Sequence, residues 1–310
     1  MIHGFGTREI TDQILRVFVK SAKGEMHEKA RTVGQYEQTE WPTYDWENEM
    51  YHWDEYSDTP YDFAIWGVLR GTERVIEQAK EEKRNWYFFD HAYVMNESKH
   101  NINFHLKERV YRCTKNAQMI NEIDTLSDDD YKRIEKYKQH IEIEPWIKSG
   151  KYVLVLEPSD FAKKWWNVEN WTENIIKLLK ANTKKEVRIR KKNSTVSFES
   201  EVKHSFAVIS LQSAAAIQAL IWGIPSFCGK MSAAYPVSHS TNDMQWIDSP
   251  YYHDMREPWL QSILANQYTW TEIVDGTCWN RLKNKKKPKG NKYATVDKIM
   301  VEGKPAALRL

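Results

Sequence analysis

Three features of the sequence predict an α/β protein with two domains, each built on a parallel sheet. In both halves, stretches typical of strands alternate with stretches typical of helices, as in proteins whose helices cover both faces of a parallel sheet. The chain has 310 residues and 41% hydrophobic content, enough for two separate cores. A linker-like segment, 146–151, joins the halves. We therefore expect domains at 1–147 and 148–282, facing each other across a cleft, and a basic tail at 283–310.

The first half contains a βαβ unit after an opening helix. Apolar residues at positions 10, 14, 17 and 18 share one helical face, directly after a short turn at 3–6 (HGFG). The segment 35–58 is crowded with Trp, Tyr and Glu and has no clear period, so we interpret it as an irregular insertion. The βαβ unit consists of a strand at Tyr61–Leu69, a helix at Thr72–Lys83 and a strand at Asn85–Val94.

The second half repeats this alternation after a helix that starts near Ser127 and ends before Pro145. Its strands are expected at 151–159, 186–192, 205–210 and 225–229, and its helices at 171–182 and 213–223. Open parallel sheets bind ligands beyond the carboxyl ends of their strands. Functional residues are therefore sought at those ends.

Composition limits the class of protein. The formal net charge of +2 predicts no overall attraction to nucleic acid or to an acidic membrane. The longest apolar run, 214–224, is too short to span a bilayer, and the charged first twenty residues are no signal peptide. Three cysteines without metal-ligand or disulfide spacing fit a reducing compartment. We expect a soluble, cytoplasmic monomer without membrane association.

The first candidate site follows the strand 205–210. A small-residue helix begins near Ser213, and its N–H groups and the Ser213 hydroxyl are suited to a phosphate, with Ala214 allowing close approach. Ser210 and Gln212 belong to the same predicted site. The alternative is an N-cap serine on a helix packed against its sheet.

The second candidate site is the strand EVRIRKK, 186–192. Alternation sends Arg188, Arg190 and Lys192 to one face, and an arginine fork suits a diphosphate. The alternative is a solvated edge strand guarded by its charges.

The third candidate site is FFDHAYV, 88–94, where a strand of buried character ends on Asp90 and His91. Aromatic neighbours should exclude water from Asp90 and raise its proton affinity, as a general base requires. His91 is the second candidate, as the base or as a group that orients it. The alternatives are that Asp90 caps the following turn and that His91 is a hydrogen-bonded core histidine.

The segment SLQSAAAIQALIWGIPSFCG, 210–229, resembles the donor-binding segment of GT-B glycosyltransferases, which have two Rossmann-like domains. That resemblance implies that Arg188, Arg190 and Ser213 hold the diphosphate of a nucleotide sugar, most simply a UDP-sugar, and that Asp90 takes the proton of the acceptor hydroxyl. No essential cofactor or metal is expected, because no His or Cys cluster has metal-ligand spacing and no G-x-x-x-x-G-K-[ST] motif is present. No Glu clearly placed for the donor ribose is found.

A metal-dependent GT-A enzyme would instead use a D-x-D motif, and Asp128 and Asp130 have that spacing. However, Ser127 and Asp130 also have the spacing of a capping box ahead of a helix, which favours a helix start. Thr269 and Glu272 predict a second capping box, before the last helix.

The basic segments 184–192 and 281–292, beside aromatic residues, favour a polyanionic acceptor; the alternative for the second is a solvated tail. The chain also resembles phage DNA glucosyltransferases in size. The main hypothesis is therefore transfer of a hexose or pentose to a hydroxymethylated pyrimidine, such as 5-hydroxymethylcytosine, in double-stranded bacteriophage DNA. Two alternatives stay open: a glycosyltransferase of surface polysaccharide or lipopolysaccharide synthesis, and a non-catalytic nucleotide- or nucleic-acid-binding protein. The predicted acceptor contacts are Gly6, Arg70, Arg112, Lys285, Lys286 and Lys287.

Overall fold

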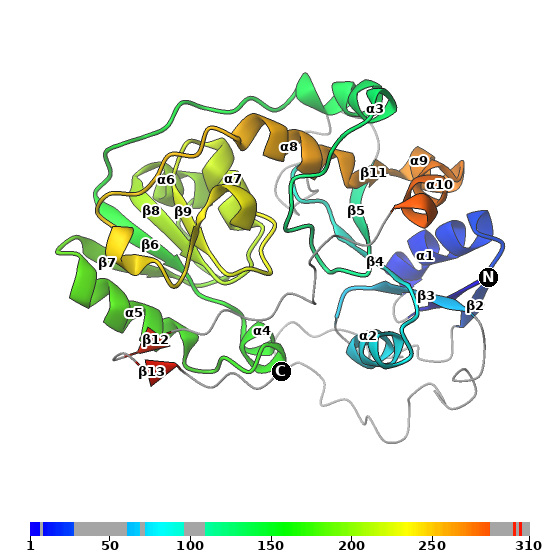
Figure 1. Cartoon of the computed structure of the whole chain (residues 1–310), viewed down its shortest axis with the longest axis horizontal. Helices are drawn as coiled ribbons and strands as arrows, with labels where there is room; N and C mark the ends of the chain where they lie inside the picture. Colours follow the sequence, from blue (N-terminus) through cyan, green and yellow to red (C-terminus); the bar gives the residue numbers. More distant parts are fainter. Residues whose placement is uncertain are drawn as a thin grey trace. The chain divides into compact units, whose positions relative to one another are not determined.

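The computed structural model describes residues 1–6, 9–27, 61–68, 72–95, 109–285, 300–301 and 304–305 (Figure 1). The chain forms two compact units: Met1–Gln118 with Asn266–Lys287, and Met119–Ala265 with Pro288–Leu310. Each unit has its own sheet, and most neighbouring strands in both sheets are parallel. The predicted α/β class with two sheets is confirmed. The predicted insertion 35–58 lies outside the described residues.

The first unit contains a six-stranded sheet of order β11-β5-β4-β3-β1-β2. The first four strands along the chain pair in parallel, whereas β5 and β11 run antiparallel at one side. The predicted βαβ unit is present as β3, α2 and β4. The strands are β1 (Ile2–Phe5), β2 (Glu25–His27), β3 (Asp62–Trp66), β4 (Trp86–His91), β5 (Val110–Lys115) and β11 (Gln267–Thr269).

The opening segment HGFG is a buried strand, so the prediction of a turn was wrong. Residues Ile2–Phe5 form β1, paired on both sides. A Cβ on Gly4 would overlap the side chains of Met26 and Val19, so glycine lets them pack closely against the strand. Two glycines in four residues are typical of a turn, and so short a strand shows no measurable alternation.

Helices cover both faces of this sheet (Figure 1). Phe63, Ile65 and Phe88 pack with α2 on one face, and Tyr87, Phe89 and Cys113 pack with α1 and α10 on the other. These two sets alternate along the strands, as the period of two requires. The helices of this unit are α1 (Glu9–Ser21), α2 (Thr72–Glu81), α9 (Trp270–Val274) and α10 (Thr277–Asn284).

The segment 266–285 belongs to the first unit, although residues up to 282 were expected in the second domain. Strand β11 pairs with β5, and Tyr268, Cys278 and Leu282 are buried with residues of α1. Local periodicity shows that a strand and helices form here, but it carries no information about which sheet the strand joins.

The second unit contains a five-stranded parallel sheet of order β10-β9-β8-β6-β7. Ile175 of α5 packs on one face, and Val202 of α6 and Ala219 of α7 pack on the other (Figure 1). Its strands are β6 (Tyr152–Leu156), β7 (Glu186–Arg190), β8 (Ser205–Ser210), β9 (Ser226–Cys228) and β10 (His239–Ser240). Its helices are α3 (Asp128–Lys138), α4 (Asp160–Trp165), α5 (Trp171–Asn182), α6 (Phe198–Lys203), α7 (Ala215–Ile221) and α8 (Arg256–Ala265), with short 3-10 turns η2 (Tyr235–Val237) and η3 (Met244–Trp246).

Helix α3 ends at Lys138, earlier than the residue before Pro145. The residues that follow, HIEIEP, alternate apolar and charged side chains, a period of two that does not fit a helix. They run on in an irregular conformation, and the Glu144 N–H donates to the carbonyl of Ile221 (2.8 Å).

Both predicted capping boxes are present. The Ser127 hydroxyl accepts from the Asp130 N–H at the start of α3, and the Thr269 hydroxyl accepts from the Glu272 N–H at the start of α9. In each box the carboxylate accepts the N–H of the cap residue in return. The Asp128/Asp130 pair therefore begins a helix.

Removing the second box should lower stability. We expect Thr269→Ala to reduce the free energy of unfolding by about 1–2 kcal/mol, because the N–H of Glu272 loses its acceptor. Val274→Ala, at an exposed position of the same helix, is the matched control and should change it by no more than about 0.5 kcal/mol. Urea unfolding followed by tryptophan fluorescence measures both; equal effects would contradict a role for the cap.

Candidate functional site

The carboxyl edge of the first sheet carries the predicted catalytic pair. Strands β1, β3 and β4 end there, and antiparallel β5 begins there. Asp90 and His91 are the last residues of β4. They lie at the edge where open parallel sheets bind ligands, as the sequence predicted.

Asp90 is held by two contacts. It lies directly opposite Arg112 of β5, and its Oδ2 forms an ion pair with Arg112 Nη2. Its Oδ1 accepts the backbone N–H of His91 (2.8 Å). The Asp90 side chain is 27% exposed and that of Arg112 only 8% exposed. The carboxylate is therefore oriented by the protein and still reachable from solvent, as a general base must be.

The aromatic rings near this ion pair lie against Arg112 and not against Asp90 itself. Its guanidinium lies 5.5 Å from the ring centre of Phe88 and 5.3 Å from that of Tyr93. His91 points to the opposite face, is exposed, and meets Trp66 edge-on at 5.5 Å. It is thus not a core histidine, the alternative considered above.

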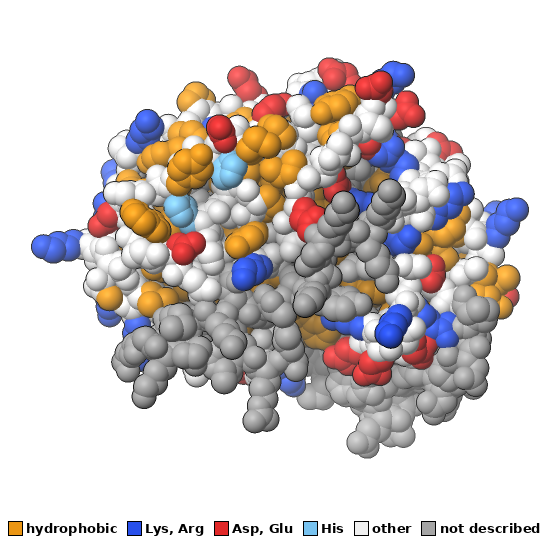
Figure 2. Space-filling model, in the orientation of Figure 1, with side chains coloured by type: hydrophobic (Ala, Val, Ile, Leu, Met, Phe, Trp, Pro, Cys, Tyr) orange, Lys and Arg blue, Asp and Glu red, His pale blue; other side chains and the backbone are white. Residues whose placement is uncertain are grey.

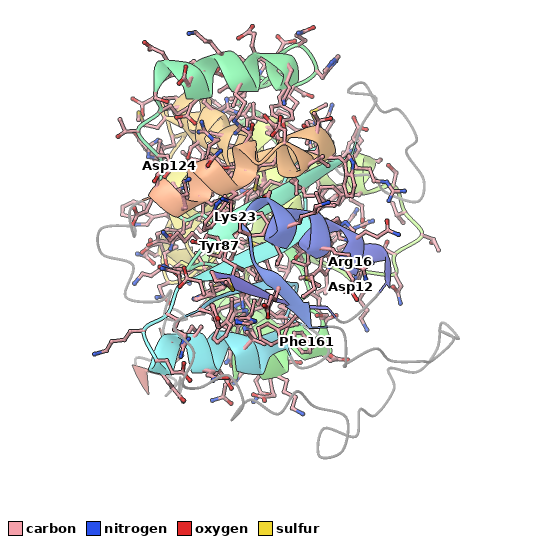
Figure 3. All side chains as sticks on the ribbon, turned by 90° about the vertical axis from the view of Figure 1, so that its right-hand side faces the viewer. Asp12, Arg16, Lys23, Tyr87, Asp124 and Phe161 are labelled. Atoms are coloured by element: carbon pink, nitrogen blue, oxygen red, sulfur yellow. The ribbon has the colours of Figure 1, made fainter. Side chains whose placement is uncertain are left out.

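Asp12 was not singled out by sequence reasoning, although it lies beside a predicted site residue. It is fully buried in the second turn of α1, and a Cβ on Gly6 would overlap its carboxylate. Figure 3 shows Asp12 near the beginning of α1, with Arg16 one turn later. Gly6 therefore serves the packing of the β1–α1 connection. The only local signal was an acidic residue on a helix that is otherwise apolar on its buried side.

The corresponding edge of the second unit carries the predicted donor residues. The Ser210 hydroxyl is buried and accepts the N–H of Ser213 (2.9 Å), which closes the turn after β8. Helix α7 begins at Ala215 with Ala214 as its N-cap residue, two residues later than predicted. The exposed Ser213 hydroxyl accepts the N–H of Ala215 (3.2 Å), and Gln212 is half-buried.

A glycine lets the loop after β9 come close to this turn. The Gly229 N–H donates to the carbonyls of Ser210 (3.3 Å) and Leu211 (3.1 Å). A Cβ on Gly229 would crowd the Leu211 carbonyl. Residues 210–214 and 229 thus form one rigid edge with an exposed hydroxyl at Ser213.

The predicted arginines are engaged within the second unit. Arg188 forms a bidentate ion pair with Glu186 (2.7 and 3.1 Å) and lies 3.9 Å over the ring of Tyr152, at the amino end of β6. Arg190 pairs with Glu201 and donates to Ser194 (3.2 Å). Both lie on edge strand β7, where they hold neighbouring segments; Lys192 is exposed. A diphosphate role for these three residues stays a prediction.

The predicted DNA contacts are only partly described. Arg70, Lys286 and Lys287 lie outside the described residues. Arg112 is buried, and the Nζ of Lys285 donates to Asn266 Oδ1 (2.6 Å). Large exposed aromatics are found elsewhere, at Trp246 and Tyr251. Figure 2 shows hydrophobic side chains gathered around two histidines on one face of the molecule.

The three cysteines are free and buried. Burial raises the pKa of the Cys228 thiol to about 12, despite hydrogen bonds with Ser238 and Ser232. A pKa this high makes the thiolate fraction at pH 8 about 10³-fold smaller than that of an ordinary thiol. Cys228 is therefore a core residue of β9 and no nucleophile.

We expect iodoacetamide at pH 8 to leave Cys228 of the folded chain unmodified while labelling all three cysteines in 8 M urea. Peptide mass spectrometry at matched times measures the difference. Rapid labelling of Cys228 in the folded chain would show that its thiol is accessible and would contradict its burial in the core.

Among the described residues, no three His, Cys, Asp or Glu side chains are grouped to hold a metal ion. Likewise, no helix in the part of the chain that the structure describes is long and apolar enough to cross a membrane.

Comparison with known proteins gives only distant similarities. No protein-family model matches the chain, and no curated protein sequence matches it significantly. Among solved structures, a Thermosulfurimonas dismutans KpsC β-Kdo 2,7 transferase overlaps 91% of this chain and 99% of its own, with a TM-score of 0.48 and 11% identity. The β-Kdo 2,4 transferase of the same KpsC overlaps 90% and 98%, with a TM-score of 0.42 and 8% identity. Similarity this low assigns neither a family nor an activity.

Proposed function

We propose that this chain is a nucleotide-sugar-dependent glycosyltransferase whose acceptor is a carbohydrate. The observation that carries the proposal is Asp90, a partly exposed carboxylate oriented by Arg112 and by a backbone N–H at the carboxyl edge of a mainly parallel sheet. A second parallel sheet, with the rigid edge at residues 210–214 and 229, supports it as the donor side.

In this reaction Asp90 accepts the proton of the acceptor hydroxyl. The acceptor oxygen forms a bond to the anomeric carbon of the sugar, and the bond from that carbon to the phosphate oxygen of the donor breaks. The electron pair leaves with the nucleotide. The exposed hydroxyl of Ser213 and the backbone of the 210–214 turn are the groups we assign to the leaving phosphate.

The environments of the residues predicted to contact DNA favour a carbohydrate acceptor over DNA. Binding to duplex DNA needs several exposed cations along the phosphate backbone. The three described contacts do not form such a series: Gly6 packs against Asp12, Arg112 is a single cation paired with Asp90, and Lys285 is hydrogen-bonded to Asn266.

The test is turnover of nucleotide sugars by the full chain. A panel of UDP-, GDP-, TDP- and CMP-linked sugars is incubated with the protein, and released nucleotide is measured with and without mixed oligosaccharides. We expect slow hydrolysis of one donor, accelerated by an oligosaccharide. Acceleration only by duplex DNA containing 5-hydroxymethylcytosine would move the acceptor to DNA, and binding without turnover would indicate a non-catalytic module.

A further inference from the structure

Arg112 makes few hydrogen bonds for a buried cation. Among the described residues its one hydrogen bond runs from Nη2 to Asp90, and its enclosed Nε has no acceptor. A guanidinium has five N–H donors. Arg190, of similar exposure at 13%, donates to Ser194, Val196 and Glu201. Within the described part of the chain, Arg112 therefore has N–H donors without an acceptor, whereas Arg190 uses the donors of both Nη1 and Nη2.

The surrounding residues hold Arg112 in place. Gln267, Arg112 and Asp90 are directly opposite one another on β11, β5 and β4, so their side chains share one face. The Gln267 side chain accepts the N–H of Val94 (2.8 Å), which fixes the segment carrying Tyr93 beside the guanidinium. Two rings thus enclose the cation at the edge of the sheet.

We propose that Arg112 binds an oxyanion of the acceptor sugar, a carboxylate or a phosphate, beside Asp90. The inference rests on the proposed function and names its substrate class. After the bond to Asp90, Nη2 keeps a second N–H, and Nη1 makes no hydrogen bond within the described residues; together they form a fork that matches two oxygens of one anion. A neutral sugar offers no charged acceptor to this fork.

The contact between Arg112 and Asp90 also places acceptor binding next to the proposed base. Because Arg112 and Asp90 are in contact, an acidic sugar held by the guanidinium brings a neighbouring hydroxyl of the same ring next to the Asp90 carboxylate. Aromatic walls at Phe88 and Tyr93 reduce competition from water, which strengthens a charge-assisted hydrogen bond. Arg112 would thereby select acidic acceptors and orient them toward the base.

The test is a titration of the ¹⁵N-labelled full chain, followed through the arginine Nε–Hε signals. The ligands are methyl β-glucuronide, glucose 6-phosphate and neutral methyl β-glucoside. The Arg112 signal is assigned with Arg112→Lys or by its contact with the Tyr93 ring. The matched internal control is Arg84, whose Nε already pairs with Glu82 in the same unit.

We expect the Arg112 signal to move and saturate with glucuronide while the Arg84 signal stays in place. Movement with glucose 6-phosphate alone assigns a phosphorylated acceptor instead. No movement with either anion, or equal movement with the neutral glucoside, overturns the proposal. The titration is independent of catalysis, so a failed glycosyltransferase assignment shows separately as absent nucleotide-sugar turnover.

The kinetic counterpart uses the acidic acceptor once transfer is detected. Arg112→Lys keeps the charge but loses the planar fork, and we expect it to raise the acceptor KM by about 10-fold or more with a smaller change in kcat. Equal KM values for both proteins would contradict the assignment.

Discussion

Asp90→Asn should reduce glycosyl transfer by about 10²- to 10⁴-fold, the range typical for loss of a general base. Asparagine keeps the size of the side chain and can still accept from the His91 N–H, but it cannot take up a proton from the acceptor hydroxyl. Donor binding, measured by calorimetry, should not change, because Asp90 is assigned to the acceptor. Initial rates at saturating donor measure the effect.

The control must show whether Asp90→Asn reduces transfer by removing the base or by destabilising the fold. Asp90→Asn leaves buried Arg112 without its charged partner, which should cost about 1–3 kcal/mol of stability. Glu82→Gln removes a comparable ion pair in the same unit, since Glu82 and Arg84 are 24% and 14% exposed. Glu82→Gln should therefore be destabilised but fully active. A comparable loss of transfer in both variants would mean that Asp90 acts only through folding.

Gly223→Ala should destabilise the second unit by about 3 kcal/mol or more. Gly223 has φ +76°, a region that disfavours alanine by about 1–2 kcal/mol, and a Cβ there would overlap the carbonyl oxygen of Pro145. The Ile147 N–H donates to the Gly223 carbonyl (2.8 Å), so the two segments cannot separate without breaking this contact.

Gly67→Ala is the matched control for Gly223→Ala. Gly67 also has a positive φ, +64°, but a Cβ there meets nothing within 4 Å. Only the conformational cost of about 1–2 kcal/mol should remain. Hydrogen exchange of the peptides spanning β9 and β3 measures each unit separately. Equal losses of amide protection in the two variants would show that the contact with Pro145 adds nothing to the destabilisation by Gly223→Ala.

Gly223, Ile224 and Pro225 form a G-x-P sequence within the segment 210–229, which resembles a donor-binding segment. In the structure these residues join α7 to β9, where Gly223 packs against the 144–147 segment and Ile224 is buried. Their direct contribution is to the fold.

Local pattern predicted most of the second unit. Residues 152–156, 171–182 and 205–210 form the predicted strands and helix, because runs of Val, Ile and Leu bounded by polar turns are strong signals. The strands β1 and β5 were missed or misread. The first overlaps the segment HGFG, 3–6, whose two glycines in four residues are typical of a turn. The second, VYRCTK, lacks a clear apolar alternation because Arg112 and Thr114 are buried, opposite Asp90 and Phe88 of β4.

The position of Asp90 at the edge of the sheet was predicted, but its contacts were not. A buried aromatic strand ending in Asp90 is visible in the sequence, and the sheet edge follows from the βαβ order. That Arg112 lies opposite Asp90 depends on a pairing between segments 22 residues apart in the chain, which local periodicity does not encode. For the same reason, the pairing of Arg190 with Glu201 could not be predicted.

The most direct test of the proposed function is transfer of a labelled sugar by the wild type, Asp90→Asn and Glu82→Gln in one assay. The acceptors are acidic oligosaccharides, neutral oligosaccharides and duplex DNA containing 5-hydroxymethylcytosine. We predict label on the acidic oligosaccharides with the wild type and Glu82→Gln, and almost none with Asp90→Asn. Undiminished transfer by Asp90→Asn, or label confined to the DNA, would contradict this account.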